Sequence, residues 1–152
     1  MTTNEFWKSY LKVAGLSEDN AVYSGELCFE DSGFAGRTQL SLLLSGEKTA
    51  TFTPLDVIEI NREALPVPGE VYVVLDSNEE PCCIIELTDV NIIPLNEISW
   101  DLAQRDGENE SLAEWQDKMK EYLEDEADLC GFEARDDSKI VCEIFRMIYK
   151  KA

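Results

Sequence analysis

Two short segments of the chain contain the residue types that could do chemistry. Residues 46–51 (GEKTAT) supply an amine on Lys48 and hydroxyls on the threonines, and residues 107–112 (GENESL) supply a carboxylate on Glu108. The sequence contains no histidine, which removes the usual general base, a common metal ligand and every catalytic triad that depends on an imidazole. Any catalysis would therefore use lysine, hydroxyl groups and carboxylates.

Lys48 and Thr51 are spaced so that an amine could meet a hydroxyl. Gly46 is predicted to end a helix in the left-handed conformation, and a short strand that carries Thr51 follows Lys48. If the two side chains converge, a neutral amine could take the threonine proton and activate a nucleophile, or could activate water instead. Burial of Lys48 would have to outweigh the negative field of the protein, which favours the protonated amine. The alternative is that Lys48 is a surface residue and Thr51 a strand filler.

Glu108 is predicted to lie on a loop between two helices. Gly107 permits a tight turn there, so the carboxylate could reach a cleft and act as an acid or a positioning group. Alternatively, Glu108 and Glu110 favour the N-terminus of a helix that begins at Ser111. That alternative suits Glu110 better and leaves the role of Glu108 open.

Further side chains could bind a substrate, namely Arg37, Thr49, Thr53, Glu86 and Trp100. The two threonines alternate with the candidate nucleophile on one predicted strand, and the arginine lies in a predicted helix just before the motif. The tryptophan could stack on a planar base. The glutamate lies inside an apolar strand, where it either lines a barrel or faces solvent. A second tryptophan, Trp115, fits the apolar stripe of a helix and is interpreted as a core residue.

The cysteines do not indicate a metal or cofactor site. The chain has five of them, with no CxxC spacing, so we predict buried free thiols and neither a zinc site nor a disulfide framework. Carboxylates are abundant, but no calcium-loop spacing and no glycine-rich phosphate loop is present. We therefore expect no metal and no cofactor.

Size and charge limit the class of protein. A chain of 152 residues with 44% hydrophobic content fits one domain, and we expect no membrane span, no secretory signal and a cytoplasmic location. The formal net charge is −19, which disfavours long nucleic acids as partners. Residues 97–137 contain fifteen acidic and four basic side chains, which is typical of a solubilising helical surface.

The hydrophobic periodicity predicts an α+β fold. We expect an additional N-terminal helix within residues 1–20, capped by Asn4, and a short extended piece over 27–29. Later helices are predicted over 34–45, 55–63, 97–104 and 111–127, and strands over 49–53, 70–76, 82–93 and 140–149. With about five strands, mostly antiparallel, and no repeating βαβ unit, the pattern favours a small curved sheet or barrel.

The order of these motifs resembles the ASCH domain family. The resemblance covers about residues 34–149 and rests on residues 46–51, 65–69 (LPVPG), 83–86 (CIIE), 107–112 followed by Trp115, and the closing strand. It looks closest to a branch of small bacterial proteins with a G-x-K-T-A-T segment. The family is similar in fold to PUA domains, so the resemblance implies a small β-barrel with flanking helices.

The resemblance also implies a pocket for a nucleobase or for RNA. Some relatives are amidohydrolases that remove the acetyl group from N4-acetylcytidine with a lysine, a threonine and a glutamate. Carried over by motif, these roles fall on Lys48 as base, Thr51 as nucleophile and Glu108 as acid or leaving-group positioner. The chain departs from that branch at Thr53, where an arginine is usual, and in its additional N-terminal helix.

Three functions are consistent with these observations. The first is an enzyme that hydrolyses acylated nucleosides in the manner of N4-acetylcytidine. The second is an RNA-binding module for single-stranded RNA, with weak ribonuclease activity as an option, and it needs basic side chains to converge on the pocket. The third is a regulator that binds a nucleoside-like ligand without turnover.

Overall fold

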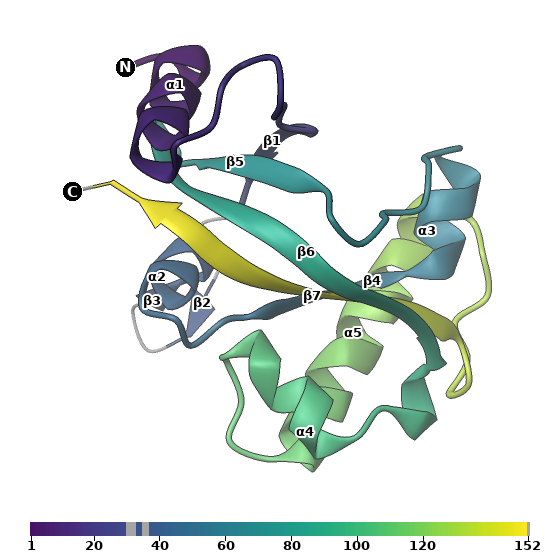
Figure 1. Cartoon of the computed structure of the whole chain (residues 1–152). Coiled ribbons are helices and arrows are strands. Elements are labelled where there is room, and N and C mark those ends of the chain that lie inside the picture. The colour runs from purple at the N-terminus through teal and green to yellow at the C-terminus, as the bar shows by residue number, and fades with distance from the viewer. Residues whose placement is uncertain (30–32, 35–36, 152) are drawn as a thin grey trace.

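The computed structural model describes the backbone of residues 1–29, 33–34 and 37–151. Helices and strands alternate irregularly along the chain, as expected for an α+β fold (Figure 1). The helical elements are α1 (Thr3–Ala14), α2 (Gln39–Leu44), α3 (Leu55–Ile60), η1 (Leu95–Glu97), α4 (Trp100–Ala103), η2 (Gln104–Asp106) and α5 (Leu112–Cys130). The strands are β1 (Gly25–Cys28), β2 (Gly33–Phe34), β3 (Arg37–Thr38), β4 (Ala50–Pro54), β5 (Val71–Leu75), β6 (Pro81–Pro94) and β7 (Lys139–Lys150).

A five-stranded sheet in the order β1-β5-β6-β7-β4 forms the centre of the fold. The long strands β6 and β7 are antiparallel, and their register shifts at Ile84/Ile85 and at Leu87/Asp89. Such irregularities increase local twist, and the sheet curls into a half-barrel with helices beside it (Figure 1). The predicted α+β fold with about five strands is confirmed. One pairing is not antiparallel, because β1 runs parallel to β5.

The helix predicted over 34–45 is shorter in the structure. Its first part pairs instead as the small antiparallel ladder of β2 with β3, and the helix α2 begins only at Gln39. Gly46, with φ of 83°, follows α2 in the left-handed conformation that the sequence predicted. The helical part that remains still delivers the chain into residue 48.

One predicted helix cap and the start of one predicted helix differ in the structure. Thr2, not Asn4, caps α1, and its side chain accepts a hydrogen bond from the backbone N–H of Glu5. The helix predicted from residue 97 begins as the short η1, and Ser99 caps the separate α4. The long acidic helix begins as expected, with Ser111 accepting from the N–H of Glu114.

The apolar residues form three packed clusters, which are distributed over the two ends and the inside of the curled sheet. At one end, Phe6, Trp7 and Leu11 of α1 pack on Val73 and Ile84. At the other end, α4 and α5 pack on β4 and β7, and Trp115 is central to that cluster. The third cluster, with Leu43, Ile85, Leu87 and Phe145 among its members, fills the inner face of the sheet.

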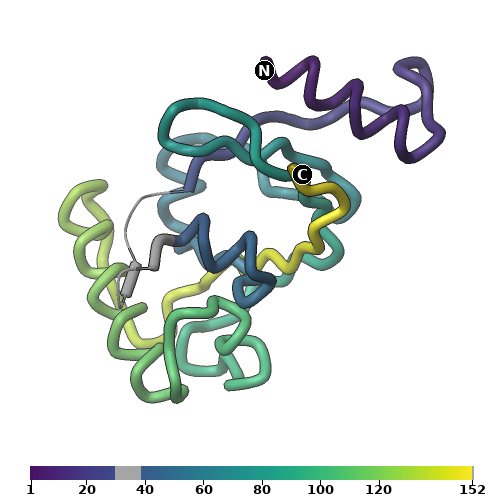
Figure 2. The backbone as a smooth tube through the Cα atoms, turned by 90° about the vertical axis from the view of Figure 1, so that its left-hand side faces the viewer, coloured from purple at the N-terminus to yellow at the C-terminus, as the bar shows by residue number. Residues whose placement is uncertain are grey.

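The two helical ends lie far apart in both views of the backbone (Figures 1 and 2). α1 sits beyond the end of the sheet where β7 finishes, whereas α5 lies across the opposite end. None of the helices in the described part of the chain has the length and apolar character that a bilayer span requires.

Candidate active site

The strand β4 places Thr51 opposite a carboxylate. β4 pairs antiparallel with β7, and the register sets Thr51 directly across from Glu143. Side chains of directly opposed residues lie on the same face of the sheet. The Thr51 hydroxyl donates a hydrogen bond to Glu143 Oε2 at 3.0 Å. A hydroxyl nucleophile and a proton acceptor are therefore in contact.

Burial sets the protonation of Glu143. Desolvation raises the pKa of its carboxyl above the ordinary glutamate value, and the hydrogen bond from Thr51 partly opposes this effect. The nearby carboxylate of Glu70 raises the pKa of Glu143 further. A carboxylate whose pKa is moved toward neutrality is suited to accept and return a proton.

Lys48 is buried at the junction between α2 and β4, with only 4% of its surface exposed. The backbone N–H of Lys48 bonds to the carbonyl of Leu42 at 3.0 Å, which fixes the residue to the end of α2. Its ammonium Nζ donates to Asp106 Oδ1 at 2.5 Å, so the buried charge is paired. The alternative of a surface lysine is therefore wrong.

Asp106 connects the two sequence motifs. One of its carboxylate oxygens binds Lys48, and the other accepts a hydrogen bond from the indole Nε1 of Trp115 at 3.1 Å. Trp115 is 1% exposed, as predicted for a core residue, and its N–H is satisfied by this contact. Asp106 thus joins the end of η2, the junction at Lys48 and the helix α5.

A close backbone contact holds the two motif segments together. The N–H of Thr49 bonds to the carbonyl of Arg105 at 2.8 Å. Gly107 has φ of 84°, and a Cβ atom added to it would lie 3.0 Å from the carbonyl oxygen of Glu47 and 3.2 Å from the nitrogen of Lys48. Only glycine fits both the conformation and the space.

Glu108 lines the same cavity as Lys48 and Thr51. Desolvation raises the pKa of the Glu108 carboxyl, and the charge of Asp106 raises it further, whereas Lys48 and Lys118 lower it. A raised pKa favours the protonated form, which can donate a proton. Next to it, Asn109 Oδ1 is buried and has no hydrogen-bond partner among the described residues.

The cavity has a volume of about 470 Å³ and lies between the β4 strand and the loop before α5. Its polar wall contains Gln39, Lys48, Thr51, Thr53, Asp106, Glu108, Asn109 and Lys118, and its apolar wall contains Phe29, Phe52, Trp115 and Met119, with Cys28 and Tyr122 completing the lining. The structure therefore brings all three residues predicted to be catalytic to one cavity.

Only some of the residues predicted to bind substrate line this cavity. Thr53 lines the cavity. Thr49 instead accepts a hydrogen bond from the Arg105 guanidinium at 3.4 Å. Glu86 lies outside the cavity and pairs with Arg146 at 2.7 Å, so the solvent-facing alternative is the one observed.

The two remaining predicted binders are Trp100 and Arg37. Trp100 begins α4 and packs against the core cluster around Trp115, away from the cavity lining. The side chain of Arg37 lies outside the described residues.

Two residues of the site, Asp106 and Glu143, were not predicted from the sequence. The signal for Glu143 was a single carboxylate in the apolar strand predicted over 140–149, the same signal that drew attention to Glu86. The signal for Asp106 was its position just before the turn glycine. What the sequence could not supply was the register that pairs Glu143 with Thr51.

The cysteines are also less uniform than predicted. Cys83 and Cys142 are buried, and burial raises the pKa of each thiol to about 12. Cys28, by contrast, is exposed and lines the cavity. The prediction that all five are buried thiols is wrong for this residue, because the edge strand β1 leaves it uncovered, and Cys82 and Cys130 are only partly buried.

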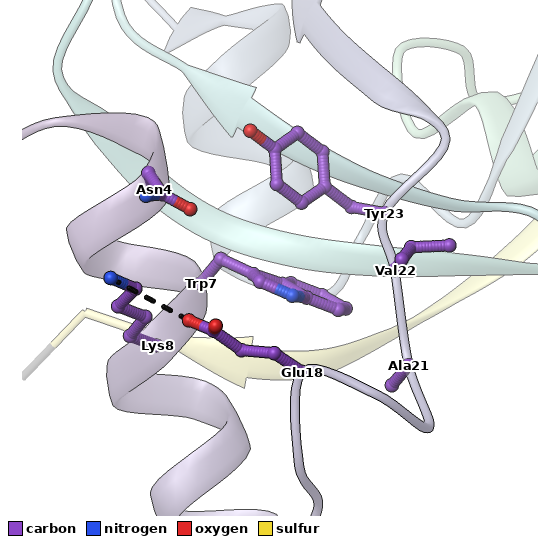
Figure 3. A pocket seen from close by; sticks show the side chains of 7 residues that line it. All are labelled: Asn4, Trp7, Lys8, Glu18, Ala21, Val22 and Tyr23. Atoms are coloured by element: carbon purple, nitrogen blue, oxygen red, sulfur yellow. Dashed lines mark ion pairs between the residues drawn. The ribbon is translucent and has the colours of Figure 1, made fainter.

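A different hollow of about 350 Å³ lies at the other end of the molecule, beside α1. Its rim is bridged by an ion pair of 3.5 Å between Lys8 on α1 and Glu18 on the following loop, with Trp7 and Tyr23 in the wall (Figure 3). Among its described lining residues, no hydroxyl donates a hydrogen bond to a carboxylate in the way that Thr51 donates to Glu143. This hollow is therefore the weaker candidate for catalysis.

Comparison with known proteins identifies the family. A crystal structure of a protein from Enterococcus faecalis V583 aligns with a TM-score of 0.79 and 28% identity over 97% of this chain and 88% of that one. The crystal structure of an ASCH domain from Lactobacillus crispatus JV V101 aligns with a TM-score of 0.81 and 29% identity over 96% and 93% of the two chains. No curated protein matches the chain. A family model for the ASCH domain matches residues 28–149, which include both motif segments and Glu143, and the chain therefore belongs to the ASCH domain family.

Proposed function

We propose that the protein is an amidohydrolase that removes an acyl group from the amino group of a nucleoside-like molecule, with N4-acetylcytidine as the model substrate. The observation that carries this proposal is the hydrogen bond of the Thr51 hydroxyl to Glu143, which joins a nucleophile to a proton acceptor at the wall of a cavity. The cavity volume of about 470 Å³ lies within the range of about 300–1,000 Å³ typical of small-molecule sites. The substrate class comes from the resemblance of the motifs to those of ASCH amidohydrolases.

In the first step, Thr51 Oγ1 attacks the amide carbonyl carbon while Glu143 accepts the hydroxyl proton. Protonated Glu108 then donates its proton to the departing nitrogen, which leaves as a free amine. The acyl group remains as an ester on Thr51. Both glutamates suit these roles because burial raises their pKa above the ordinary glutamate value, which makes each a better proton acceptor when ionised.

In the second step, water hydrolyses the ester. Glu108, now ionised, takes a proton from the attacking water, and Glu143 returns its proton to the leaving oxygen of Thr51. The products are a carboxylic acid and an amine, and both glutamates recover their starting protonation states. No oxidant, metal or cofactor is needed for this balance.

Lys48 and Asp106 supply charge and position in this scheme. Lys48 is paired with the Asp106 carboxylate, and its positive charge in the buried wall opposes the negative charge that develops on the carbonyl oxygen. The assignment of Lys48 as the base, which the family resemblance implies, stays a prediction. Lys48→Arg separates the two roles, because arginine keeps the charge but does not accept a proton.

The test is hydrolysis of N4-acetylcytidine, followed by chromatography of the released cytidine. We expect kcat to fall at least ~100-fold in Thr51→Ala and Glu143→Gln, a loss typical of removing a nucleophile or general base. In the wild type, kcat should fall at high pH as Glu108 loses the proton that it donates. This fall should be absent in Glu108→Gln. Residual activity in Lys48→Arg supports a charge role, and complete loss in that variant assigns the base to Lys48.

Matched controls come from residues away from the cavity. Thr88→Ala removes an exposed threonine hydroxyl and Glu121→Gln an exposed carboxylate, and both should keep wild-type rates. Circular dichroism of each variant checks folding. Wild-type activity in Thr51→Ala would exclude the mechanism, and inactivity of the wild-type protein on every acylated nucleoside tested would exclude the proposed function.

RNA binding is the second candidate, because the ASCH domain is a PUA-like fold often tied to RNA binding. The charges of the described residues favour it less. Lys48 and Lys118 are the cations among the described lining residues, and they are paired with Asp106 and with Glu114 at 3.6 Å. The net charge of −19 opposes phosphate contacts.

Filter binding with single-stranded RNA over a salt series distinguishes the two functions. The amidohydrolase proposal predicts no retention above that of an acidic control protein at ~150 mM salt, where phosphate contacts are screened. Micromolar retention with a steep salt dependence, together with no turnover, would favour the binding module.

A further inference from the structure

A second cavity adjoins the first at Thr51. It has a volume of about 250 Å³ and shares Cys28, Phe29, Thr51 and Thr53 with the larger cavity. Its own lining comes from the inner face of the curled sheet, namely Leu27 of β1, Tyr72 of β5, Ile85 and Leu87 of β6, and Glu143 and Phe145 of β7. We call it the apolar chamber, and the larger cavity the polar chamber.

The two chambers differ in chemistry, and the nucleophile stands between them. Lys48, Asp106 and Glu108 line only the polar chamber. The apolar chamber contains Glu143 as its one carboxylate among the described lining residues, and that carboxylate is occupied by the Thr51 hydroxyl. Thr51 lines both chambers and therefore lies where the polar lining of one meets the mostly apolar lining of the other.

An amide substrate likewise has a polar part and an apolar part. Its carbonyl carbon carries the acyl chain on one side and the nitrogen on the other, so attack by Thr51 sends these two parts of the substrate in different directions. The nitrogen must lie near Glu108, the proposed proton donor, which belongs to the polar chamber. The acyl chain then points toward the apolar chamber.

Apart from Glu143, the described walls of the apolar chamber are uncharged, and several of them are held in the core. Ile85, Leu87 and Phe145 are buried members of the inner core cluster, which holds their positions. The Tyr72 hydroxyl donates to Glu70 at 3.1 Å, and burial raises the pKa of Tyr72 to about 12, so the ring remains neutral at physiological pH. A volume of about 250 Å³ corresponds to roughly eight waters at ~30 Å³ each, far more room than the two carbons of an acetyl group need.

We propose that the apolar chamber is an acyl-binding site and that the preferred substrates carry aliphatic or aromatic acyl groups larger than acetyl, of about four to eight carbons. This inference rests on the proposed function, because it assigns the direction of the acyl chain from the role of Thr51. Each methylene that leaves water for the chamber should raise kcat/KM about fourfold until the chamber is full.

The experiment is a series of N4-acylcytidines with acetyl, butanoyl, hexanoyl, octanoyl, dodecanoyl and benzoyl groups, compared by kcat/KM. We expect a rise of at least tenfold from acetyl to hexanoyl and a fall at dodecanoyl. A flat or descending series with measurable acetyl hydrolysis overturns the acyl-site proposal and leaves the proposed function intact. No hydrolysis of any member overturns both.

A variant that fills the apolar chamber tests whether the acyl chain binds there. Leu27 lies on the edge strand β1 and is partly exposed, so Leu27→Trp adds bulk with little cost to the core. We expect the hexanoyl-to-acetyl ratio of kcat/KM to fall at least tenfold in this variant. Val22→Trp, at a 79% exposed position outside both chambers, is the control and should leave the ratio unchanged. An unchanged ratio in folded Leu27→Trp overturns the placement of the acyl chain, and the wild-type series stands as the test if that variant does not fold.

Discussion

At the scale of single residues, the site depends on two pairs that are buried or partly buried. Thr51 with Glu143 provides a hydroxyl and a carboxylate, and Lys48 with Asp106 provides opposite charges. Removing one partner of a buried charged pair leaves the other uncompensated and is more costly than losing an exposed ion pair. Mutations at these four positions therefore report on folding as well as chemistry, and isosteric substitutions are the most informative.

Glu143→Gln should stabilise the protein at neutral pH. Burial raises the pKa of Glu143, so the folded state binds more protons than the unfolded state between the ordinary glutamate value and the raised one. The contribution of this group to stability therefore falls as pH rises through that window. Glutamine keeps the shape and still accepts the Thr51 hydrogen bond, so we expect Glu143→Gln to unfold at a higher urea concentration than the wild type at pH 8.

Urea denaturation of both proteins at pH 4 and pH 8 measures this effect. The advantage of Glu143→Gln should appear at pH 8 and shrink toward pH 4, where wild-type Glu143 is protonated. Glu121→Gln changes an exposed carboxyl of α5 and should show no such difference. An equal advantage of Glu143→Gln at both pH values would contradict a desolvated charge as its cause.

At the scale of elements, one tight contact between loops aligns the two motifs. Gly107 follows η2, and its missing side chain allows the backbone of residues 47–48 to approach. The alignment of Lys48 with Asp106 depends on this approach, which links α2, β4 and the loop before α5.

Gly107→Ala should cost about 2–3 kcal/mol of stability, from the positive φ and from a clash with backbone that cannot move freely. Gly131→Ala is the matched control, because its φ of 83° is nearly the same and a Cβ atom there meets nothing within 4 Å. Thermal or chemical denaturation gives both values. Equal losses in the two variants would show that conformation alone matters and that the close contact does not.

The sequence predicted elements better than it predicted their pairing. Alternating and helical patterns located β4, β5, β6, β7 and α5 within a few residues, because each has a long apolar face. The short pieces were harder, since β2 and β3 have only two residues each, and propensity does not resolve a ladder of that size. Glu143 and Asp106 were missed because their roles arise from strand register and loop packing between residues far apart in the chain.

At the scale of the whole molecule, net charge is the dominant feature. With a formal charge of −19 on 152 residues, the negative side chains repel one another and destabilise the folded state. The acidic helix α5 carries part of that charge. Screening by salt reduces such repulsion, with a Debye length of about 10 Å at 0.1 M.

Stability should therefore rise with ionic strength at neutral pH. We expect the Tm at pH 7 to increase by about 3 °C or more between 20 and 300 mM sodium chloride, which corresponds to ~1 kcal/mol for a chain of this size. The increase should disappear near pH 4.1, the sequence isoelectric point, because little net charge is left to screen. Scanning calorimetry at both pH values measures it, and a Tm that falls with salt at pH 7 would show that attractive ion pairs outweigh repulsion.

The exposed Cys28 makes the junction of the two chambers chemically addressable. Cys83 and Cys142 are shielded, with thiol pKa values of about 12, and burial also raises the pKa of Cys82. A mild electrophile therefore finds its most accessible sulfur beside Thr51, at the boundary shared by both compartments. Covalent fragments tethered at that sulfur could extend into either compartment, so a tethering screen would sample the amine side and the acyl side of a ligand from one anchor.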